Sequence, residues 1–385
     1  AADSHARSWH RSARRLHPRA RPTFTAGVPC PDSFLSNDQT MFMPPDSRLH
    51  LDPQDEYTHT PEAAGNYNES MYFNAFDTAR GIGAWMRLGN RPNEGHAEMT
   101  CCVYLPDGRV GFMYGRPPIS HNEAMDAGGL RFEVLEPFKR LRVSYEGELL
   151  IMDDPHAMAD PGSAFKRYPK RRAAISLDYE GISPMHGGEI VALDGSRLEL
   201  DPEHSVYRGH TEQNMAVRGH ITVDGVRHEI DGFGYRDKSW GPRHWHSFYW
   251  YKWLPVTFDR GFGVLLSVKG RKGGLPNNVS GNVLRNGRYE PVLEGRIATV
   301  YDDKYYPVRF TALVRTAERS YTLEGEVGAL LPLRHKSASG EPGAYTRITE
   351  GITTYRCEGR TALGMSEYCD VMVNGTPISV LEEPA

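Results

Sequence analysis

The feature that most constrains the fold is a repeated pattern of two short runs, each alternating apolar and polar residues, joined by a turn dipeptide. Such hairpins are expected at residues 96–114, 141–152 and 220–230, with Asp-Gly or Glu-Gly at their turns. Alternation with a period of two buries one face of a strand, and Asp-Gly favours tight hairpin turns. The 39 glycines and 27 prolines of the 385-residue chain suit a protein with many turns. The sequence therefore predicts an all-β sandwich or barrel set with few short helices.

The domain organisation follows from the length of the chain and from the spacing of these runs. A length of 385 residues is enough for two domains. We expect a disordered, Arg-rich tail over residues 1–45, an N-terminal β-domain over residues 60–205 and a C-terminal β-domain over residues 206–385. The strands are spaced too irregularly for a propeller repeat.

Charge and composition argue against several classes of partner. The net charge is −4 at pH 7, and the first 40 residues carry six arginines against three aspartates, so the rest of the chain is more acidic still. An acidic body argues against nucleic acid as the main partner. No apolar run reaches about 18 residues, so no membrane span is expected. The five cysteines form no Cys-x-x-Cys pair, which indicates a reduced, cytoplasmic protein.

Residues 235–253 give the clearest chemical signal in the chain. Four of the six tryptophans lie there, at Trp240, Trp245, Trp250 and Trp253. Dense aromatic side chains suit an apolar ligand or a carbocation. We therefore expect this segment to form the wall of a binding pocket and part of the functional site.

Tyr235 and Asp237 lie in this segment and share one face of the expected strand. Burial in an aromatic pocket disfavours the charged form of a carboxylic acid and raises its pKa. Such a group can act as a general acid near neutral pH. Asp237 is therefore the candidate proton donor, and Tyr235 the residue that positions it. A stabilised β-corner, with Asp237 paired to Arg236 or Arg243, is the structural alternative.

His210 and Glu212 also share a strand face by alternation. A hydrogen-bonded pair that relays a proton or holds water is favoured over a metal site, because one His-x-Glu pair is weak evidence for a metal. The sequence contains no phosphate-binding loop, no dinucleotide-binding glycine motif and no nucleophile elbow. No cofactor and no metal ion are therefore expected.

Further candidate site residues are scattered along the chain. Trp85 and Glu94 flank a stretch rich in Arg, Asn and Glu, which either lines a polar mouth or forms an ordered turn. Glu350, Glu367 and Asp370 near the C-terminus either point into the same barrel or have a structural role. The expected substrate-binding residues are Trp240, Trp245, Trp250, Trp85, Arg243, Glu94 and Glu367.

At residues 235–241, Tyr-Arg-Asp-Lys-Ser-Trp-Gly, the sequence resembles the carotenoid hydratase (hydroxyneurosporene synthase) superfamily, whose members carry Tyr-x-Asp-x-x-Trp-Gly. It resembles uncharacterised bacterial members more closely, through stretches such as Gly89–Glu94, Asp126–Glu133 and Gly364–Glu367. The resemblance covers residues 65–375. It implies two consecutive lipocalin-like β-barrel or sandwich domains with an apolar cavity. It also implies cofactor-free hydration or cyclisation of isoprenoids by protonation of an alkene.

The resemblance also assigns roles to individual residues. In this superfamily the Tyr-x-Asp pair is linked to acid catalysis, which gives that role to Tyr235 and Asp237. The family hydratases favour His and Asn where this chain has Arg236, Lys238 and Ser239. A lysine beside the acid would lower the pKa of the acid, unless the lysine points to the opposite strand face.

The leading hypothesis is a cofactor-independent lyase or isomerase, of hydratase, dehydratase or cyclase type. It would act by acid catalysis on a hydrophobic small molecule, terpenoid or steroid-like. The alternatives are a lipocalin-like carrier that binds such a molecule without chemistry, and a purely structural β protein. The oligomeric state stays open, with a homodimer as one option.

Overall fold

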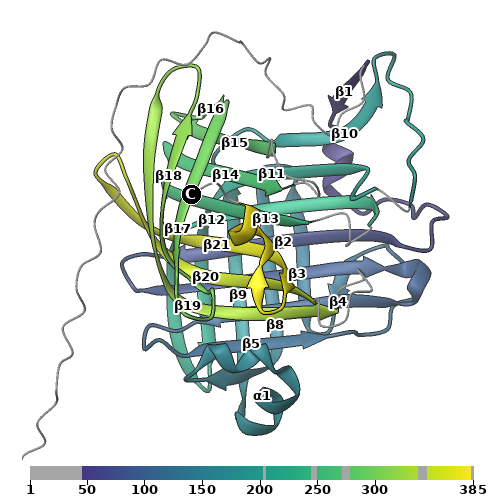
Figure 1. The fold of residues 1–385 in the computed structure, drawn as a ribbon. Helices are drawn as coiled ribbons and strands as arrows, with labels where there is room; N and C mark the ends of the chain where they lie inside the picture. Colours follow the sequence, from purple (N-terminus) through teal and green to yellow (C-terminus); the bar gives the residue numbers. More distant parts are fainter. Residues whose placement is uncertain (1–45, 203–204, 244–248, 271–277, 337–344, 383–385) are drawn as a thin grey trace, which may run out of the picture. The chain divides into compact units, whose positions relative to one another are not determined.

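A computed structural model describes residues 46–202, 205–243, 249–270, 278–336 and 345–382 (Figure 1). Over these ranges the chain forms two large antiparallel sheets, of twelve and ten strands. Two short α-helices accompany the sheets there, α1 (Pro161–Arg167) and α2 (Ile378–Glu382). The expected all-β fold with few short helices is confirmed. The expected tail over residues 1–45 lies outside the described residues.

The first sheet is built from the N-terminal part of the described chain. Its strands are β1 (Ser47–His50), β2 (Tyr67–Asp77), β3 (Ile82–Arg91), β4 (His96–Tyr104), β5 (Val110–Gly115), β6 (Met125–Ala127), β7 (Leu130–Glu136), β8 (Arg140–Met152), β9 (Lys170–Gly181), β10 (His186–Ala192), β11 (Gly209–Val223) and β12 (Val226–Pro242). Three short 3-10 helices connect strands of this part, η1 (Pro53–Glu56), η2 (Pro92–Glu94) and η3 (Pro155–Ala159).

Eight strands of the first sheet close into a barrel. Strands β2, β3, β4, β5, β8, β9, β11 and β12 pair in this order, and β12 pairs back with β2. Strand β9 completes the ring because it pairs with both β8 and β11. Eight antiparallel strands in a closed barrel are typical of lipocalins, so this part agrees with the lipocalin-like expectation.

Alternation along the strands divides their side chains between the barrel interior and its outer face. On β2, Met71 and Phe73 belong to the apolar core inside the barrel. Tyr72, between them, belongs to a separate cluster that includes Leu331 and Met365 of the second sheet. The outer face of the barrel therefore packs against the second sheet.

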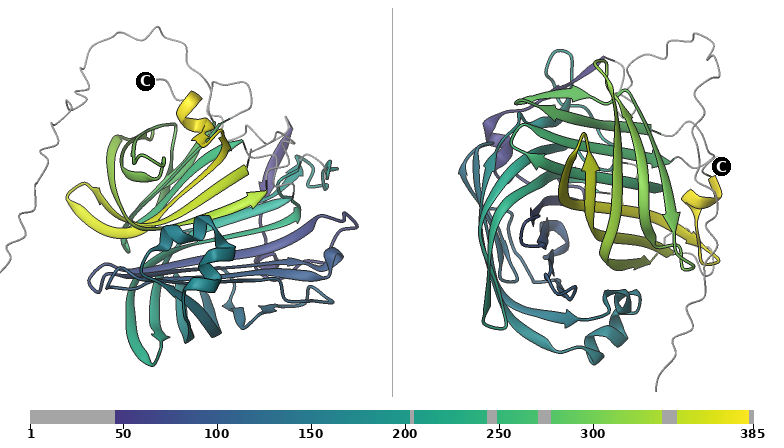
Figure 2. Two further views of the ribbon diagram at one scale, coloured as in Figure 1. Left: turned by 60° about the horizontal axis from the view of Figure 1, so that its bottom comes forward. Right: turned by 90° about the vertical axis from the view of Figure 1, so that its left-hand side faces the viewer.

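The second sheet follows the first in the chain and is also strongly curled (Figure 2). Its strands are β13 (Trp250–Asp259), β14 (Phe262–Gly270), β15 (Asn278–Arg285), β16 (Arg288–Pro291), β17 (Glu294–Tyr301), β18 (Pro307–Arg315), β19 (Ser320–Lys336), β20 (Tyr345–Cys357), β21 (Arg360–Val373) and β22 (Thr376–Pro377). Strands β13 and β21 pair at its centre, and a second apolar core, which includes Phe310 and Tyr355, packs on one of its faces.

The change from one sheet to the other falls between Pro242 and Trp250. The sequence placed a boundary at residues 205 and 206, which is inside the first sheet, because β11 and β12 pair with β9 and β2. The motif over residues 235–241 thus belongs to the first sheet. This pairing joins strands that are far apart in the sequence, and the spacing of neighbouring strands along the chain does not predict it.

Two of the three hairpins expected from the sequence are present, and the third is wrong. Residues 96–114 form β4 and β5, and residues 220–230 join β11 to β12 through Asp224 and Gly225, both with positive φ. Residues 141–152 instead form one uninterrupted strand, β8, whose residues 140–150 all pair with β9. The Glu-Gly dipeptide favours a turn only weakly, and the continuous pairing of β8 with the long strand β9 keeps the chain extended there.

Buried ion pairs tie the chain before β2 to the barrel interior. Arg236 of β12 donates two hydrogen bonds to Glu56 of η1, at 2.5 and 2.6 Å. Lys238 donates to Glu69 of β2 at 2.6 Å, and Nδ1 of His59 lies 2.8 Å from the same carboxylate. The Arg236–Glu56 and Lys238–Glu69 side chains are at most 1% exposed. The barrel interior is therefore occupied by charged pairs as well as by apolar side chains.

In the described part of the chain, no helix has the length and apolar character needed to cross a membrane.

The Arg236→Met substitution tests the contribution of the buried pair to stability. It leaves the Glu56 carboxylate buried without its partner, so the free energy of unfolding should fall by about 3–5 kcal/mol in urea or thermal unfolding. The matched control is Arg218→Met on β11, whose ion pair with Asp231 is exposed, with an 80% exposed Arg218 side chain. The control should change stability by no more than about 0.5 kcal/mol. If both substitutions changed stability by a similarly small amount, the Arg236–Glu56 pair would not be a buried, stabilising interaction.

Candidate active site

Side chains of β11 and β12 that point away from the barrel interior meet the second sheet and form the candidate site. Glu212 lies opposite Asp237 in the β11–β12 pairing, so alternation puts His210, Glu212, Tyr235 and Asp237 on one face. The indole of Trp253, on β13 of the second sheet, donates a hydrogen bond to Glu212 at 3.0 Å. The site therefore lies between the two sheets.

His210 and Asp237 form the central pair of the site. Nε2 of His210 is in hydrogen-bonding contact with Oδ2 of Asp237, and the ring of Tyr207 stacks on His210 with centroids 5.0 Å apart. Burial favours the neutral form of each group, but their mutual attraction prevails. It leaves the pKa of His210 raised and the pKa of Asp237 lowered. Asp237 therefore carries a negative charge, and His210 holds the proton.

This result differs from the expectation that Asp237 is the proton donor. The expectation rested on burial alone, and the sequence did not place His210 against the carboxylate. It left Arg236 and Arg243 as alternative partners. Arg236 faces the barrel interior with Glu56, while Arg243 lies close enough for its charge to help lower the pKa of Asp237.

Lys238, which the sequence raised as a possible complication, does not act on the acid. It points to the barrel interior, where it donates to Glu69. Burial raises the pKa of Glu69, but the attraction of Lys238 and His59 outweighs burial and lowers that pKa to about 2. The positive charge of Lys238 is thus neutralised on the opposite face of β12.

Glu212 is the second proton carrier of this face. Burial raises its pKa, His210 opposes this shift, and the negative charge of Asp237 adds to it. The hydroxyl of Tyr235 is buried and has no hydrogen-bond partner among the described residues. Burial and the nearby Glu212 both raise the pKa of Tyr235. Burial therefore favours the neutral forms of Glu212 and Tyr235 beside a charged pair.

The second sheet supplies the opposite wall. The hydroxyl of Tyr251, on β13, donates to Glu367 of β21, and Trp253 lies directly opposite Glu367 in the β13–β21 pairing. Burial and the neighbouring Arg87 lower the pKa of Arg243 to about 10. Positive charge therefore gathers beside the carboxylates of the site.

The central pair of the site is partly exposed to solvent. The side chains of His210 and Asp237 are 26% and 24% exposed, although they lie among buried residues. Tyr72 stands next to them as part of an aromatic group, with its ring centroid 6.0 Å from that of Trp85 and 5.5 Å from that of Trp253. Aromatic surface thus borders the polar cluster.

One possible ion site coincides with this cluster. His210, Glu212 and Asp237 each offer one ligand atom within 4.8 Å of the others, and imidazole and carboxylate are ligands of divalent metals. The local charges oppose a bound cation, because Arg243 acts on Asp237 and Lys269 acts on Glu212 with positive charge. The cluster fits a proton-carrying centre better than a metal centre.

Several expected substrate-binding residues lie elsewhere. Trp240 faces the barrel interior, where it stacks on His59 with centroids 4.4 Å apart. Trp250 is buried in the core of the second sheet, and Glu94 is on the surface, bound to Arg91. Strand alternation turns Trp240 and Trp250 away from the faces that form the site. Trp245 lies outside the described residues.

Trp85, Arg243 and Glu367 do lie in the layer between the sheets. Trp85 donates to the hydroxyl of Tyr104 at 3.2 Å and stacks near Tyr72. Arg243 donates to Ser239 at 2.7 Å. These three residues were predicted from their side-chain chemistry alone. They lie in the same layer because the strands that carry them pair or pack together.

Four further residues of the site were not among the individually predicted site residues. Two of them, Tyr251 and Trp253, lie in the Trp-rich segment that was expected to form the pocket wall, and they face the site because they alternate with Trp250 along β13. No local sequence pattern marks Lys269 or Tyr207 as a site residue. Each of them reaches the site only because segments far apart in the sequence pair or pack together. Their positions depend on the three-dimensional fold alone.

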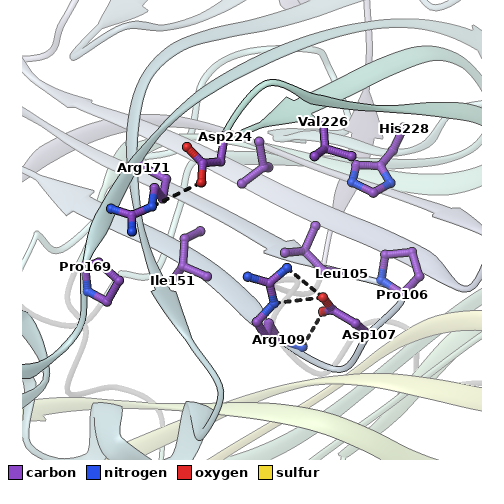
Figure 3. Close-up of a pocket in the computed structure, with 11 residues that line it drawn as sticks. Leu105, Pro106, Asp107, Arg109, Ile151, Pro169, Arg171, Asp224, Val226 and His228 are labelled. Atoms are coloured by element: carbon purple, nitrogen blue, oxygen red, sulfur yellow. Dashed lines mark hydrogen bonds and ion pairs between the residues drawn. The ribbon is translucent and has the colours of Figure 1, made fainter.

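A separate hollow of about 380 Å³ lies at one end of the first barrel (Figure 3). Its charged side chains are paired with one another, Arg109 with Asp107 and Arg171 with Asp224. No carboxylate or imidazole cluster comparable to that of the site lines it.

The family described as a domain of unknown function, DUF7064, matches residues 52–372. The chain belongs to this family. Among proteins with curated functions, none shows significant similarity to the chain. The family match covers both sheets, including every described residue of the candidate site.

Solved structures show the same kind of fold. A protein designated AttH from Nitrosomonas europaea is similar with a TM-score of 0.54 and 14% identity, over 83% of this chain and 96% of that one. CghA with Sch210972 gives a TM-score of 0.48 and 13% identity, over 87% and 98%. Kievitone hydratase from Nectria haematococca gives 0.46 and 9%, over 80% and 90%. The likeness to AttH shows a shared fold.

The His210–Asp237 pair can be tested by NMR titration of the His210 ring. Its pKa should lie above 6.5 in the natural protein, because Asp237 stabilises the imidazolium. In Asp237→Asn the main attraction is gone, and burial and Lys269 are opposed only by Glu212, so the pKa of His210 should fall. The contribution of this raised pKa to stability should be present below about pH 6.5 and lost as pH rises through the folded pKa.

The control for this titration is Asp231→Asn, an exposed position on the same strand. This substitution should leave the His210 titration unchanged. An unchanged titration in Asp237→Asn as well would show that the two groups are not paired in solution.

Proposed function

We propose that the protein is a cofactor-independent lyase or isomerase that acts on a hydrophobic small molecule, terpenoid or steroid-like, by acid–base catalysis. The observation that carries the proposal is the partly accessible cluster of His210, Glu212 and Asp237 between the two sheets. An acid–base cluster of this kind could catalyse hydration, dehydration or cyclisation. The roles of the residues differ from those that the motif alone indicated.

The cluster contains both an acid and a base. Glu212 has a raised pKa and is the proton donor, while Asp237, kept ionised by His210, is the proton acceptor. Trp253, whose indole donates a hydrogen bond to Glu212, orients the donor, and the hydroxyl of Tyr235, unpaired within the described part of the chain, is left to bind the substrate. Environments that shift neighbouring pKa values in opposite directions are the usual way to obtain both roles at neutral pH.

In hydration, Glu212 gives its proton to one carbon of an alkene. A C–H bond forms as the π bond opens, and positive charge develops on the adjacent carbon. Water adds to that carbon, and Asp237 accepts the proton that the water releases, which then returns to Glu212. Dehydration is the same sequence reversed. In a cyclisation a second double bond attacks the cation in place of water, and the new cation then loses a C–H proton to Asp237, so that a double bond forms in the product.

Aromatic residues support an apolar substrate with a cationic intermediate. Tyr72, Trp85 and Trp253 form a connected group next to the cluster, and aromatic faces stabilise positive charge. Two of these residues come from the first sheet and one from the second, so a substrate held here would contact both sheets.

The Asp237→Asn substitution is the direct test of the catalytic proposal. It removes the base and the partner of His210, so kcat should fall by about 10²–10⁴-fold while folding and ligand binding persist. Circular dichroism and ligand titration report on folding and binding. The control is Asp231→Asn, the exposed position on the same strand, which should keep full activity. Turnover retained in Asp237→Asn would exclude the mechanism.

The reaction class can be tested by incubating the purified protein with a panel of isoprenoids and steroids, followed by mass analysis. A hydratase changes the mass by one water, whereas a cyclase or isomerase changes retention at constant mass. Recovery of bound but unmodified ligand across the panel would favour a lipocalin-like carrier over an enzyme.

A further inference from the structure

A pair of glutamates lies on the wall opposite the His210 cluster. Glu350 of β20 and Glu367 of β21 are direct cross-strand neighbours in the second sheet. Both belong to the side that meets the first sheet, since Glu350 lies opposite Leu331, which packs in the apolar cluster shared by the two sheets, and Glu367 lies opposite Trp253. Glu367 accepts from the hydroxyl of Tyr251. The pair is thus part of the layer between the sheets.

Two carboxylates in this arrangement cannot both be ionised at low cost. Like charges directly opposite one another on a sheet repel, and burial strengthens the repulsion. Glu350 is 5% exposed, and neither glutamate has an ion pair within 4 Å among the described residues. Burial and the adjacent Glu367 raise the pKa of Glu350 far above its usual value. Burial also raises the pKa of Glu367, against the opposing hydrogen bond from Tyr251 and the charge of Arg87. Burial and the cross-strand pairing thus favour a shared proton over two carboxylates.

The two glutamates differ in access. Glu350 is buried, and its Oε2 has no hydrogen-bond partner among the described residues, whereas Glu367 is half-buried. Trp253 connects Glu367 to the first wall, because it pairs opposite Glu367 and donates to Glu212. The charge of Asp237 also acts on Glu367. Glu367 is therefore the accessible end of the pair and lies near the first centre.

We infer that Glu350 and Glu367 form a second, proton-sharing acid–base centre, in which Glu367 meets the substrate and Glu350 is a positioning residue that holds the shared proton. This inference rests on the proposed function and extends it from one wall of the site to two. A substrate between the sheets then has a proton donor on one side and the acceptor Asp237 on the other.

Two facing centres permit a double bond to move without a cofactor. The carboxyl pair gives its proton to one alkene carbon, so a C–H bond forms and the π bond opens. A C–H bond on the neighbouring allylic carbon breaks, its electron pair forms the new double bond, and its proton passes to Asp237. One proton is gained and one is lost, so no oxidant, reductant or metal is needed. The structure thus adds proton-transfer isomerisation of an alkene to the reactions of this site.

Infrared difference spectroscopy of the full chain tests the shared proton without a substrate. At about pH 8, Asp370, whose pKa burial raises to about 6, is ionised, so its band does not interfere. A protonated-carboxyl band should be present in the natural protein and should change in both Glu350→Gln and Glu367→Gln. The control is Glu326→Gln, an exposed glutamate on β19 of the same sheet, with a 69% exposed side chain. A band unaffected by both substitutions of the pair would overturn the inference.

The pH dependence of stability provides a second readout. Since the folded pKa values of the pair are raised, their contribution to stability is present below the unfolded pKa of about 4.3 and is lost as pH rises through the folded values. The melting temperature of the natural protein should therefore decline more steeply with rising pH than that of the double variant Glu350→Gln/Glu367→Gln. Equal slopes would contradict a proton-sharing pair.

Kinetics then separate this inference from the proposed function. With an identified substrate, Glu367→Gln should lower kcat by about 10²–10⁴-fold. Glu350→Gln removes the like charge, so the pH at which activity is lost on the basic side should move to lower values. If Asp237→Asn is inactive and both glutamine variants keep the natural kcat and pH profile, the second centre fails and the proposed function stands. If Asp237→Asn stays active, the proposed function fails, while the infrared result still decides whether the pair shares a proton.

Discussion

The buried ion pairs of Arg236 and Lys238 fix the register of β12, and the candidate site depends on that register. A shift of one residue would turn every side chain of β12 to the opposite face. It would separate the two cations from Glu56 and Glu69, and it would place the carboxylate of Asp237 inside the apolar barrel, both at high cost. The same pairs that stabilise the barrel interior therefore keep Asp237 directed toward the second sheet.

Three carboxyl groups of the site illustrate how environment assigns protonation. Asp237 is buried but has the imidazolium of His210 as a partner, so it stays ionised. Glu212 shares the same surroundings with the negative charge of Asp237 nearby, and it favours the neutral form. Glu350 has only another carboxyl group beside it, and its neutral form is favoured most strongly. The order follows from the charge nearest to each carboxyl group.

Alternation within a strand is a local property, so the sequence could predict the all-β class and the common face of Tyr235 and Asp237. It could not show what that face meets, because the answer depends on the pairing of distant strands. Trp240 illustrates this limit: it follows Asp237 by three residues but points into the barrel. The tryptophan that contacts the site, Trp253, belongs to the other sheet. The resemblance of the motif identified the strand, while the pairing of His210 with Asp237 changed the role of the acid.

The closure of the first barrel by β12 also has a consequence for biosynthesis. The partners of Arg236 and Lys238 precede them by 180 and 169 residues, and β2 pairs with β12 along its free edge. While the ribosome translates the intervening residues, this edge of β2 has no neighbour, and Glu56 and Glu69 have no cation to bury. Closure over such sequence distances is slow, and exposed strand edges promote association with other chains. This edge of β2 therefore stays open to association with other chains until residue 242 has left the exit tunnel.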